Sequence, residues 1–240
     1  MPDYQTIRLT PDFTIKAIPF ARGFSLSDFE KKLVDRIWIE AQNETAARFY
    51  NGQILNFISL EENVLLGEFI DYKFYLAQLR DESLVHSLNI QPIAISGITT
   101  TANKVLVGQR SDHVTLYKNF YELVPSGTID PECLDGDRVD FKKQFEKEVW
   151  EESAISVTDM RETNPFALIY DSNRKAYEIC AEISVNYLVA KDNLSPSEEY
   201  QQLEWVPKTE IHKFAKKHRD IFVPFSLYLL ELRFPKERNF

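Results

Sequence analysis

The spacing of hydrophobic residues in the first part of the chain predicts an amphipathic helix. In residues 25–44, hydrophobic side chains recur every three to four positions behind a Ser or Asp cap, which is the pattern of a helix with one buried face. The side chains expected on that face are Phe29, Leu33, Ile37 and Trp38.

Shorter hydrophobic runs in the following segments predict β-structure. Residues 53–71 indicate two strands around a turn at 61–63, and a short helix follows over 72–79. Residues 90–110 indicate two more strands, joined by a turn at 101–104.

The second half of the chain predicts one central helix, over residues 139–153, between groups of strands. Strands before and after this helix, with helices near the end, predict an α/β fold in which helices enclose a mixed sheet. The other elements expected are strands over 120–128, 165–172, 176–190 and 202–207, a helix capped at Thr209 and a last helix over 223–234.

A length of 240 residues suits one large domain, or one domain with a substantial extension. We place the boundary near Ser87, which gives an N-terminal α+β extension over 1–87 and a main domain over 88–240. Hydrophobic residues make up 44% of the chain, which is enough for a buried core.

Charge and cysteine content narrow the class of protein. The net charge of -9 argues against binding to nucleic-acid backbone or to anionic lipid. Cys133 and Cys180 are too few for a disulfide framework. Residues 1–13 lack the features of a signal peptide, and the most apolar stretch, 221–234, is interrupted by a proline and a glutamate. We therefore expect a cytoplasmic protein with no membrane or nucleic-acid partner.

The central helix carries an unusual concentration of negative charge. Four glutamates fall within seven positions: Glu146, Glu148, Glu151 and Glu152. At about 100° per residue, Glu152 falls inside the hydrophobic stripe and Glu148 lies at its edge. A buried carboxylate needs compensation, and Mg²⁺ or Mn²⁺ would supply it. The alternative is a solvated helix whose glutamates pair with Lys142, Lys143 and Lys147.

The residues around these glutamates resemble the Nudix box. KEVWEESAI, at 147–155, is similar to the family pattern Arg-Glu-aliphatic-x-Glu-Glu-x-Gly-aliphatic. LVPSGTIDPE, at 123–132, resembles the strand and glycine loop that open the box, and QLEWVP, at 202–207, resembles a late Glu-Trp strand of Nudix domains. The resemblance covers roughly residues 90–234 and implies a Nudix-type α/β/α sandwich.

The chain departs from the family pattern at several positions. Lys147 stands in place of the arginine, which keeps the charge but loses bidentate geometry. Ala154 replaces the second glycine, which is tolerable if its backbone is helical. The segment between Gly127 and Lys147 is longer than in the family, with residues 133–138 as the apparent insertion. Glu132 is then the nearest counterpart of the first box glutamate.

The resemblance implies roles for particular residues. Glu148, Glu151 and Glu152 would be catalytic residues that bind Mg²⁺ or Mn²⁺, and the carbonyl of Gly127 would be a further ligand. Glu148, or a glutamate outside the box, would position or deprotonate the attacking water. Metal ions are needed because they neutralise the diphosphate and acidify bound water.

Weaker candidates for substrate binding are Arg110, Lys147 and Glu178. Arg110 ends a predicted strand and could hold a phosphate, although a surface arginine in a turn explains it equally well. Glu178 and Glu182 share one face of the long strand, where an exposed sheet face is the alternative.

Hydrophobic residues near the expected site are interpreted as packing residues. Tyr72, Phe74 and Tyr75 could stack on a nucleobase, but we expect them to pack in the core. Trp150 lies opposite the stripe of the central helix, and we expect it to pack against another helix or the extension.

The layout of the N-terminal part resembles one branch of the Nudix family, which hydrolyses UDP-glucose and UDP-galactose. The similar segments are 35–42, 50–60, 65–79 and 107–111. This resemblance implies Mg²⁺-dependent hydrolysis of a UDP-sugar to UMP and a sugar 1-phosphate, with a small-molecule nucleotide as the partner and a homo-oligomer as an open expectation. The alternatives are a pyrophosphatase for ADP-ribose, an ADP-sugar or another dinucleotide, and a catalytically weak Nudix-like module that binds a nucleotide or a protein.

Overall fold

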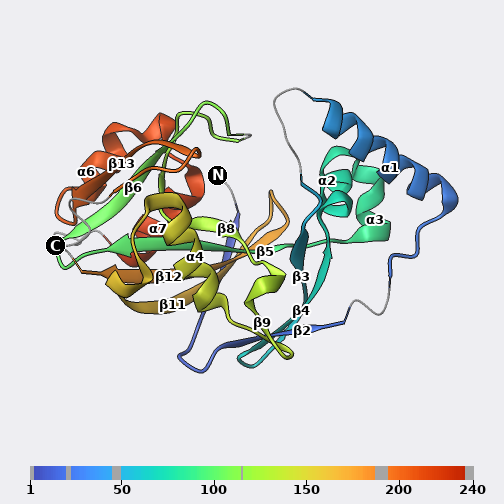
Figure 1. Ribbon diagram of the computed structural model, residues 1–240, viewed down its shortest axis with the longest axis horizontal. Coiled ribbons are helices and arrows are strands. Elements are labelled where there is room, and N and C mark those ends of the chain that lie inside the picture. Colours follow the sequence, from blue (N-terminus) through green and yellow to red (C-terminus); the bar gives the residue numbers. More distant parts are fainter. Residues whose placement is uncertain (1–2, 20–22, 45–49, 115, 187–193, 236–240) are drawn as a thin grey trace. The chain divides into compact units, whose positions relative to one another are not determined.

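The computed structural model describes residues 3–19, 23–44, 50–114, 116–186 and 194–235 (Figure 1). The chain divides into two compact units, each built from three segments. Unit 1 comprises Met1–Ile95, Gly127–Gln144 and Phe166–Ile179, and unit 2 comprises Ser96–Ser126, Phe145–Pro165 and Cys180–Phe240. A boundary near residue 87 between an extension and a main domain stays a prediction.

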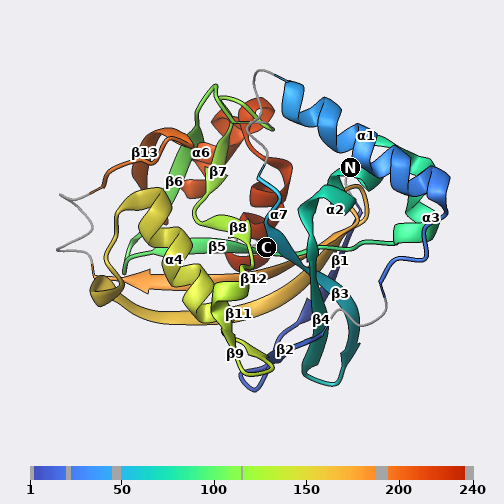
Figure 2. The same cartoon turned by 45° about the vertical axis from the view of Figure 1, so that its right-hand side comes forward.

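The strands form two sheets, and helices lie beside them, so the predicted α/β class is confirmed (Figures 1 and 2). The first sheet has the order β1 (Tyr4–Arg8), β11 (Met160–Asp171), β12 (Ala176–Val185), β5 (Ile93–Thr100), β6 (Lys104–Arg110) and β13 (Tyr200–Pro207), with β7 (Tyr121–Leu123) paired to β6 and β8 (Ser126–Thr128) paired to β5. The second sheet has the order β3 (Gln53–Glu61), β4 (Val64–Asp71), β2 (Thr14–Ile18), β10 (Arg138–Val139) and β9 (Leu134–Asp135). It is mixed, because β2 runs parallel to β4 and antiparallel to β10.

The helices follow the predicted positions closely. They are α1 (Asp28–Asn43), α2 (Tyr72–Arg80), α3 (Val85–Leu88), α4 (Phe141–Ser153), α6 (Ile211–Lys217) and α7 (Pro224–Arg233). The expected cap at Thr209 is wrong, since α6 starts after Glu210 and has no side-chain cap. Residues 187–190 of the expected long strand lie outside the described residues. No described helix is long and apolar enough to cross a membrane.

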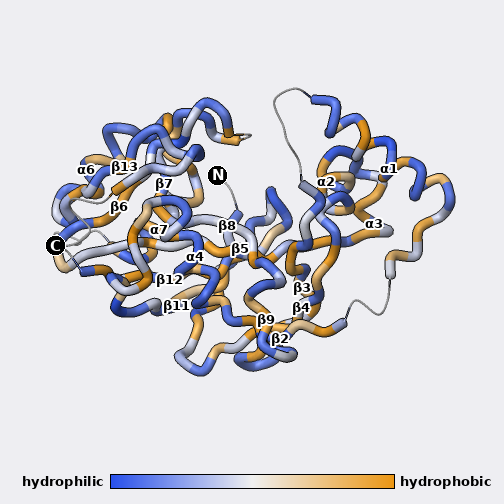
Figure 3. The backbone as a smooth tube through the Cα atoms, in the orientation of Figure 1, coloured by the Kyte–Doolittle hydropathy of each residue, from blue (hydrophilic) through white to orange (hydrophobic). Residues whose placement is uncertain are grey.

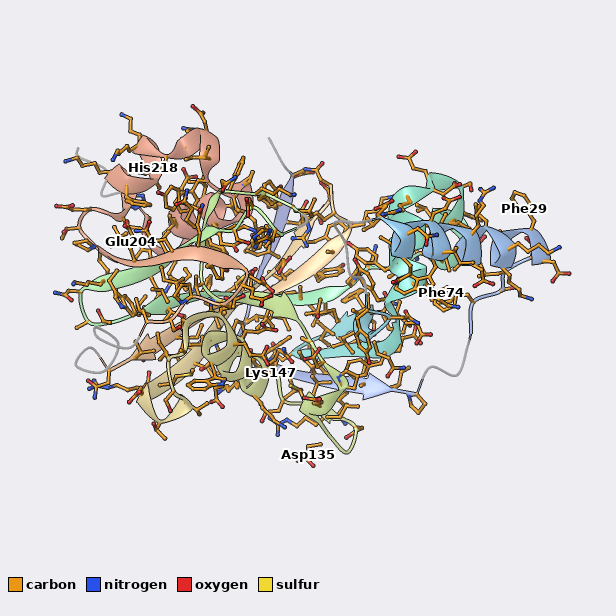
Figure 4. The ribbon with its side chains drawn as sticks, turned by 45° about the horizontal axis from the view of Figure 1, so that its top comes forward. Phe29, Phe74, Asp135, Lys147, Glu204 and His218 are labelled. Atoms are coloured by element: carbon orange, nitrogen blue, oxygen red, sulfur yellow. The ribbon has the colours of Figure 1, made fainter. Side chains whose placement is uncertain are left out.

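In unit 1, α1 buries a stripe that differs at one end from the predicted one. Leu33, Val34 and Ile37 pack in a cluster with α2 and strands β3 and β4. Figure 3 shows the matching alternation of hydrophilic and hydrophobic positions along α1. Phe29 is 73% exposed and projects from α1 (Figure 4), so its predicted burial is wrong. The reason is length: α1 has 16 residues and α2 has 9, so α2 cannot cover both ends of α1.

The aromatic residues of α2 belong to the same cluster. Tyr72, Phe74 and Tyr75 are partly buried and pack against it, as predicted. Burial raises the pKa of Tyr75 to about 12, because the phenolate would lose its hydration. These side chains therefore serve the core of unit 1.

The segment that resembles an insertion in the Nudix box is an ordered β-hairpin of unit 1. Strands β9 and β10 pair with each other, and Gly136 takes the left-handed conformation of the turn with φ of +65°. β10 also pairs with β2, where Val139 lies opposite Ile15 and is 1% exposed. The added residues thus extend the second sheet and bury a hydrophobic side chain.

In unit 2, helices cover both sides of the sheet. Figures 1 and 2 show α4 and α7 on opposite sides of the first sheet. The backbone N–H of Leu123 in β7 donates to the hydroxyl of Ser226 in α7 at 3.1 Å. Trp150, on the outer side of α4, is 53% exposed, so the expectation that it packs against another element is wrong.

Ala154 ends α4 in a conformation that favours glycine. Its φ is +59°, and its N–H donates to the carbonyl of Trp150 at 2.9 Å. The Nudix pattern has glycine at this position, and the expectation of a helical backbone that tolerates alanine is wrong. The Cβ of Ala154 is therefore strained against its own backbone.

We expect Ala154→Gly to raise the free energy of unfolding by about 0.5–1 kcal/mol, measured by urea denaturation. Relief of about 1–2 kcal/mol of left-handed strain exceeds the roughly 0.4–1 kcal/mol of flexibility that glycine adds to the unfolded chain. The reciprocal control is Gly136→Ala, where an added Cβ meets nothing within 4 Å but φ is +65°; it should lose a similar amount. A destabilised Ala154→Gly protein would contradict the assignment of a strained, left-handed backbone to Ala154.

Candidate functional site

The predicted acidic helix places one glutamate inside the core of unit 2. Phe145 and Val149 are fully buried along one side of α4, and Glu152 is 3% exposed on the same side. The prediction that Glu152 falls within the hydrophobic stripe is confirmed. A carboxylate in this position has lost most of its hydration and needs compensation from the protein or from a bound ion.

The described partners of Glu152 are few for a buried carboxylate. Its Oε1 accepts the backbone N–H of Ser126 at 3.2 Å, and its Oε2 lies 3.4 Å from the hydroxyl oxygen of Tyr200. The backbone carbonyls of Glu152 and Ser153 accept the N–H groups of Ser197 and Ser195 at 3.3 and 3.2 Å. The C-terminal end of α4 is thus fixed through its backbone, while the carboxylate receives one clear hydrogen bond.

A second buried carboxylate, Glu122 of β7, lies close to the first and was missed by the sequence analysis. Glu122 is 5% exposed, and its Oε1 accepts the Tyr200 hydroxyl at 2.7 Å. The Nη1 of Arg110 donates to the same oxygen. A usable signal was present: Glu122 is a charged residue directly before the hydrophobic run that leads to the glycine loop.

The strand register brings these residues together. Glu122 lies opposite Gly108 in the β6–β7 pair, and Tyr200 lies opposite Arg110 in the β6–β13 pair. A Cβ on Gly108 would stand 2.5 Å from Cδ1 and Cε1 of the Tyr200 ring. The ring therefore lies against bare backbone, and a glycine is required there for Tyr200 to occupy this position.

Burial raises the pKa values of both carboxyl groups, and repulsion from neighbouring carboxylates adds to the shift. The pKa of Glu152 lies well above its ordinary value of 4.5, first because of burial and then because of the charges of Glu122 and Glu148. Glu199 adds a smaller repulsion. Burial also raises the pKa of Glu122, although the Arg110 guanidinium opposes the shift. Unit 2 thus gathers Glu122, Glu148, Glu152 and Glu199 into one electrostatically coupled group.

The other predicted residues of α4 lie in different surroundings. Glu148 is half-buried, and its charge reaches Glu152. Glu151 is exposed, and its Oε1 lies 4.0 Å from the Nζ of Lys147. Lys147, labelled on α4 in Figure 4, therefore faces Glu151 along the helix. The alternative of a solvated helix with lysine partners describes Glu151 but not Glu152.

Arg110 is engaged within the protein. Besides its ion pair with Glu122, its Nε donates to the carbonyl of Leu116 at 3.2 Å. The side chain of Arg110 is 15% exposed. The structure thus assigns Arg110 to the buried carboxylate, and a contact with substrate phosphate stays a prediction.

Gly127 and Glu178 belong to unit 1. Gly127 is half-buried in β8, directly after Ser126 in the chain. Glu178 is 2% exposed, and the Nη1 of Arg174 donates to its Oε1 at 3.1 Å. The alternative of an exposed sheet face is therefore wrong for Glu178. Roles of Gly127 and Glu178 at the site stay predictions.

Glu182, the other acidic residue predicted on the long strand, is held in a network of unit 2. Its Oε1 accepts the hydroxyl of Thr100 at 2.9 Å and lies 3.7 Å from the Nζ of Lys208. Its Oε2 accepts the Nε of Arg233 at 2.7 Å. Two cations and a hydroxyl satisfy this carboxylate, so it serves the packing of the C-terminal helix.

The carboxylate group suits a hard divalent cation in its donor chemistry. Mg²⁺ and Mn²⁺ prefer carboxylate and carbonyl oxygens, and a cation would lower the repulsion between Glu122, Glu148 and Glu152. Across the described part of the chain, no three His, Cys, Asp or Glu side chains are gathered into a finished metal site. The donors fit the ion, while Glu122 is held by Arg110 and Tyr200.

The raised pKa of Glu152 predicts a pH-dependent cost to folding in the presence of a chelator. Below pH 4.5, native and unfolded states are both protonated at Glu152 and the cost is absent. As the pH rises from 4.5 to the native pKa, the unfolded state loses this proton while the native state keeps it, so stability falls until the native carboxyl group also ionises. We expect Glu152→Gln to unfold at higher urea concentration than the wild type at pH 8, with the gain vanishing towards pH 4.5.

The matched control is Glu151→Gln, one residue earlier and exposed. It should change the free energy of unfolding by no more than about 0.5 kcal/mol at either pH. A Glu152→Gln protein that is less stable than the wild type at pH 8 would contradict the proposed free-energy cost of burying the ionised carboxylate.

No protein-family model matches the chain, and no curated protein matches it. Solved structures similar to it include Tm1382, a putative Nudix hydrolase, which is 16% identical, with coverage of 82% of this chain and 96% of that chain and a TM-score of 0.46. The NUDIX domain of NrtR from Shewanella oneidensis, solved with ADP ribose, is 17% identical, with coverage of 59% and 84% and a TM-score of 0.39. A NUDIX hydrolase from Nitrosomonas europaea is 12% identical, with coverage of 59% and 86% and a TM-score of 0.40.

Proposed function

We propose that the chain is a Mg²⁺- or Mn²⁺-dependent hydrolase for the diphosphate bond of a nucleoside diphosphate linked to another group. A UDP-sugar, cleaved to UMP and a sugar 1-phosphate, is the proposed substrate. The observation that carries the proposal is that two carboxylates, Glu122 and Glu152, are buried close together. Glu152 and its neighbour Glu148 belong to the segment that resembles the Nudix box.

The cost of this pair favours a catalytic cation site over a module that only binds. Two carboxylates that share a buried region repel each other, and each has lost most of its hydration. A hydrophobic or amide residue of similar volume would relieve both costs. Strongly perturbed acidic groups of this kind are concentrated at functional sites. A module that binds a nucleotide without turnover remains the competing function.

The residues have distinct proposed roles. Glu148, Glu151 and Glu152 of the box, together with Glu122, would hold the cation, with the carbonyl of Gly127 as a further ligand. The bound cation would supply charge neutralisation of the diphosphate and acidification of water. Among the coupled carboxylates Glu122, Glu148 and Glu152, Glu148 is half-buried rather than buried, so it is the one that would accept a proton from water that enters the site.

The proposal extends to the cellular setting and to partners. We propose the cytoplasm as the cellular setting, because two cysteines, Cys133 and Cys180, are too few for the disulfide framework of a secreted protein. The partner is a small-molecule nucleotide. Assembly into a homo-oligomer stays a prediction.

The proposed site predicts that Glu151→Gln combined with Glu152→Gln lowers kcat by at least about 100-fold at saturating Mg²⁺, because oriented charge at the reacting phosphate is lost. Glu152→Gln alone should account for most of this loss, since Glu151 is exposed and pairs with Lys147. Glu231→Gln, an exposed position on α7, is the control and should keep wild-type turnover. Turnover at the wild-type level in the double variant would refute the site.

The proposed substrate predicts phosphate release in a phosphatase-coupled assay from UDP-glucose and UDP-galactose, with Mg²⁺ and not without it. The same panel contains ADP-ribose, NADH and nucleoside triphosphates. Metal-dependent turnover of one of these instead would keep the chemistry and remove the UDP-sugar assignment. Binding by calorimetry, with no product over hours, would establish the binding module as the function.

A further inference from the structure

The hydroxyl group of Tyr200 stands between the two buried carboxylates of unit 2. It donates to Glu122 at 2.7 Å and lies 3.4 Å from Glu152. The shorter distance is that of a normal O–H···O hydrogen bond, and the longer one exceeds the usual range. A hydroxyl has a single proton to donate, so this proton belongs to Glu122.

The remaining contacts fix the orientation of both carboxylates. Arg110 donates to the same oxygen of Glu122 as Tyr200 does. On Glu152, the oxygen that is turned away from Tyr200 accepts the N–H of Ser126 at 3.2 Å. Each carboxylate is thus oriented by groups from neighbouring strands, and Tyr200 is the group that contacts both.

Tyr200 is itself held rigidly. It is 3% exposed, its N–H donates to the carbonyl of Ser197 at 3.2 Å, and its ring fills the space over Gly108. A register shift between Tyr200 and Gln202 separates it from the regular ladder of β13. Bulges of this type re-aim a side chain beside a functional site. A rigid ring with a short link to its hydroxyl sets the distance from β7 to the end of α4.

We propose that Tyr200 is a positioning residue, whose hydroxyl orients Glu122 beside Glu152 for a divalent cation. This inference rests on the proposed function. Groups that hydrogen-bond to metal ligands fix the geometry of those ligands, and their loss lowers metal affinity by about 10–100-fold. Tyr200 is buried against the carboxylates, so its effect would reach the reaction through cation binding.

The test is Tyr200→Phe, which keeps the ring over Gly108 and removes only the hydroxyl. Thermal unfolding is followed as Mg²⁺ is added, and each variant is compared with its own metal-free state, so that a general loss of stability is subtracted. We expect the Mg²⁺ concentration for half-maximal stabilisation to rise by about 10-fold or more. The Mg²⁺ concentration for half-maximal turnover should rise in parallel, while KM for the nucleotide at saturating Mg²⁺ stays within about two-fold.

Tyr121→Phe is the matched control in the same unit. The ring of Tyr121 packs against Phe214 with centroids 5.2 Å apart, in an aromatic group that includes His218 and Phe222. Its Mg²⁺ dependence should equal that of the wild type. Gly108→Ala offers an independent approach, because the added Cβ displaces the Tyr200 ring while the hydroxyl is retained; it should reproduce the shift in Mg²⁺ dependence.

The outcomes separate this inference from the proposed function. If wild type and Tyr200→Phe respond to Mg²⁺ identically, the positioning role is refuted and the hydrolase proposal stands. A lower melting temperature with unchanged Mg²⁺ dependence would assign Tyr200 to packing alone and also refute it. If the wild type shows neither stabilisation by Mg²⁺ nor turnover, the proposed function and the positioning role fall together.

Discussion

The burial of two carboxylates within one compact unit is the constraint on which the rest of unit 2 depends. Glu122 and Glu152 are each at most 5% exposed, and an ionised group in such surroundings costs several kcal/mol unless it is compensated. Arg110, Tyr200 and the N–H of Ser126 supply part of that compensation. The raised pKa values of both carboxyl groups show that it is incomplete. This remaining free-energy cost is the physical reason to propose a cation site in this region.

The surrounding elements serve to hold those two groups in place. Phe145 and Val149 anchor α4 on the sheet, and the serines of the 195–197 segment bind the carbonyls at its end. Gly108 leaves room for the Tyr200 ring, and the β6 register sets Glu122 and Arg110 on neighbouring positions. Glu182 and its partners Lys208 and Arg233 satisfy a separate charge. A site held by strands and a helix is more precise than one held by loops, which suits the proposed binding of a diphosphate.

The sequence predicted the secondary structure well wherever the pattern was local. Periods of two and about 3.6 residues located the strands β3, β4, β5 and β6 and the helices α1, α4 and α7. The errors occurred where a neighbouring element decides the result. Phe29 has the right spacing to be buried but is 73% exposed, and Trp150 is likewise exposed. The left-handed backbone of Ala154 was also hidden, because alanine is not a typical signal for that conformation.

The predictions for the site divide in the same way, between what one helix determines and what contacts between elements determine. The sequence by itself determined that Glu152 would be buried and Glu148 would lie beside it, because a helix fixes the angle between its own residues. Only the tertiary structure decided that Glu122 and Tyr200 would meet Glu152, since Tyr200 is 48 residues away along the chain and the strand register brings it back. It also decided that Arg110 would bind a carboxylate of the protein. Sequence periodicity carries information about one element at a time, and contacts between elements depend on register and packing that no single segment encodes.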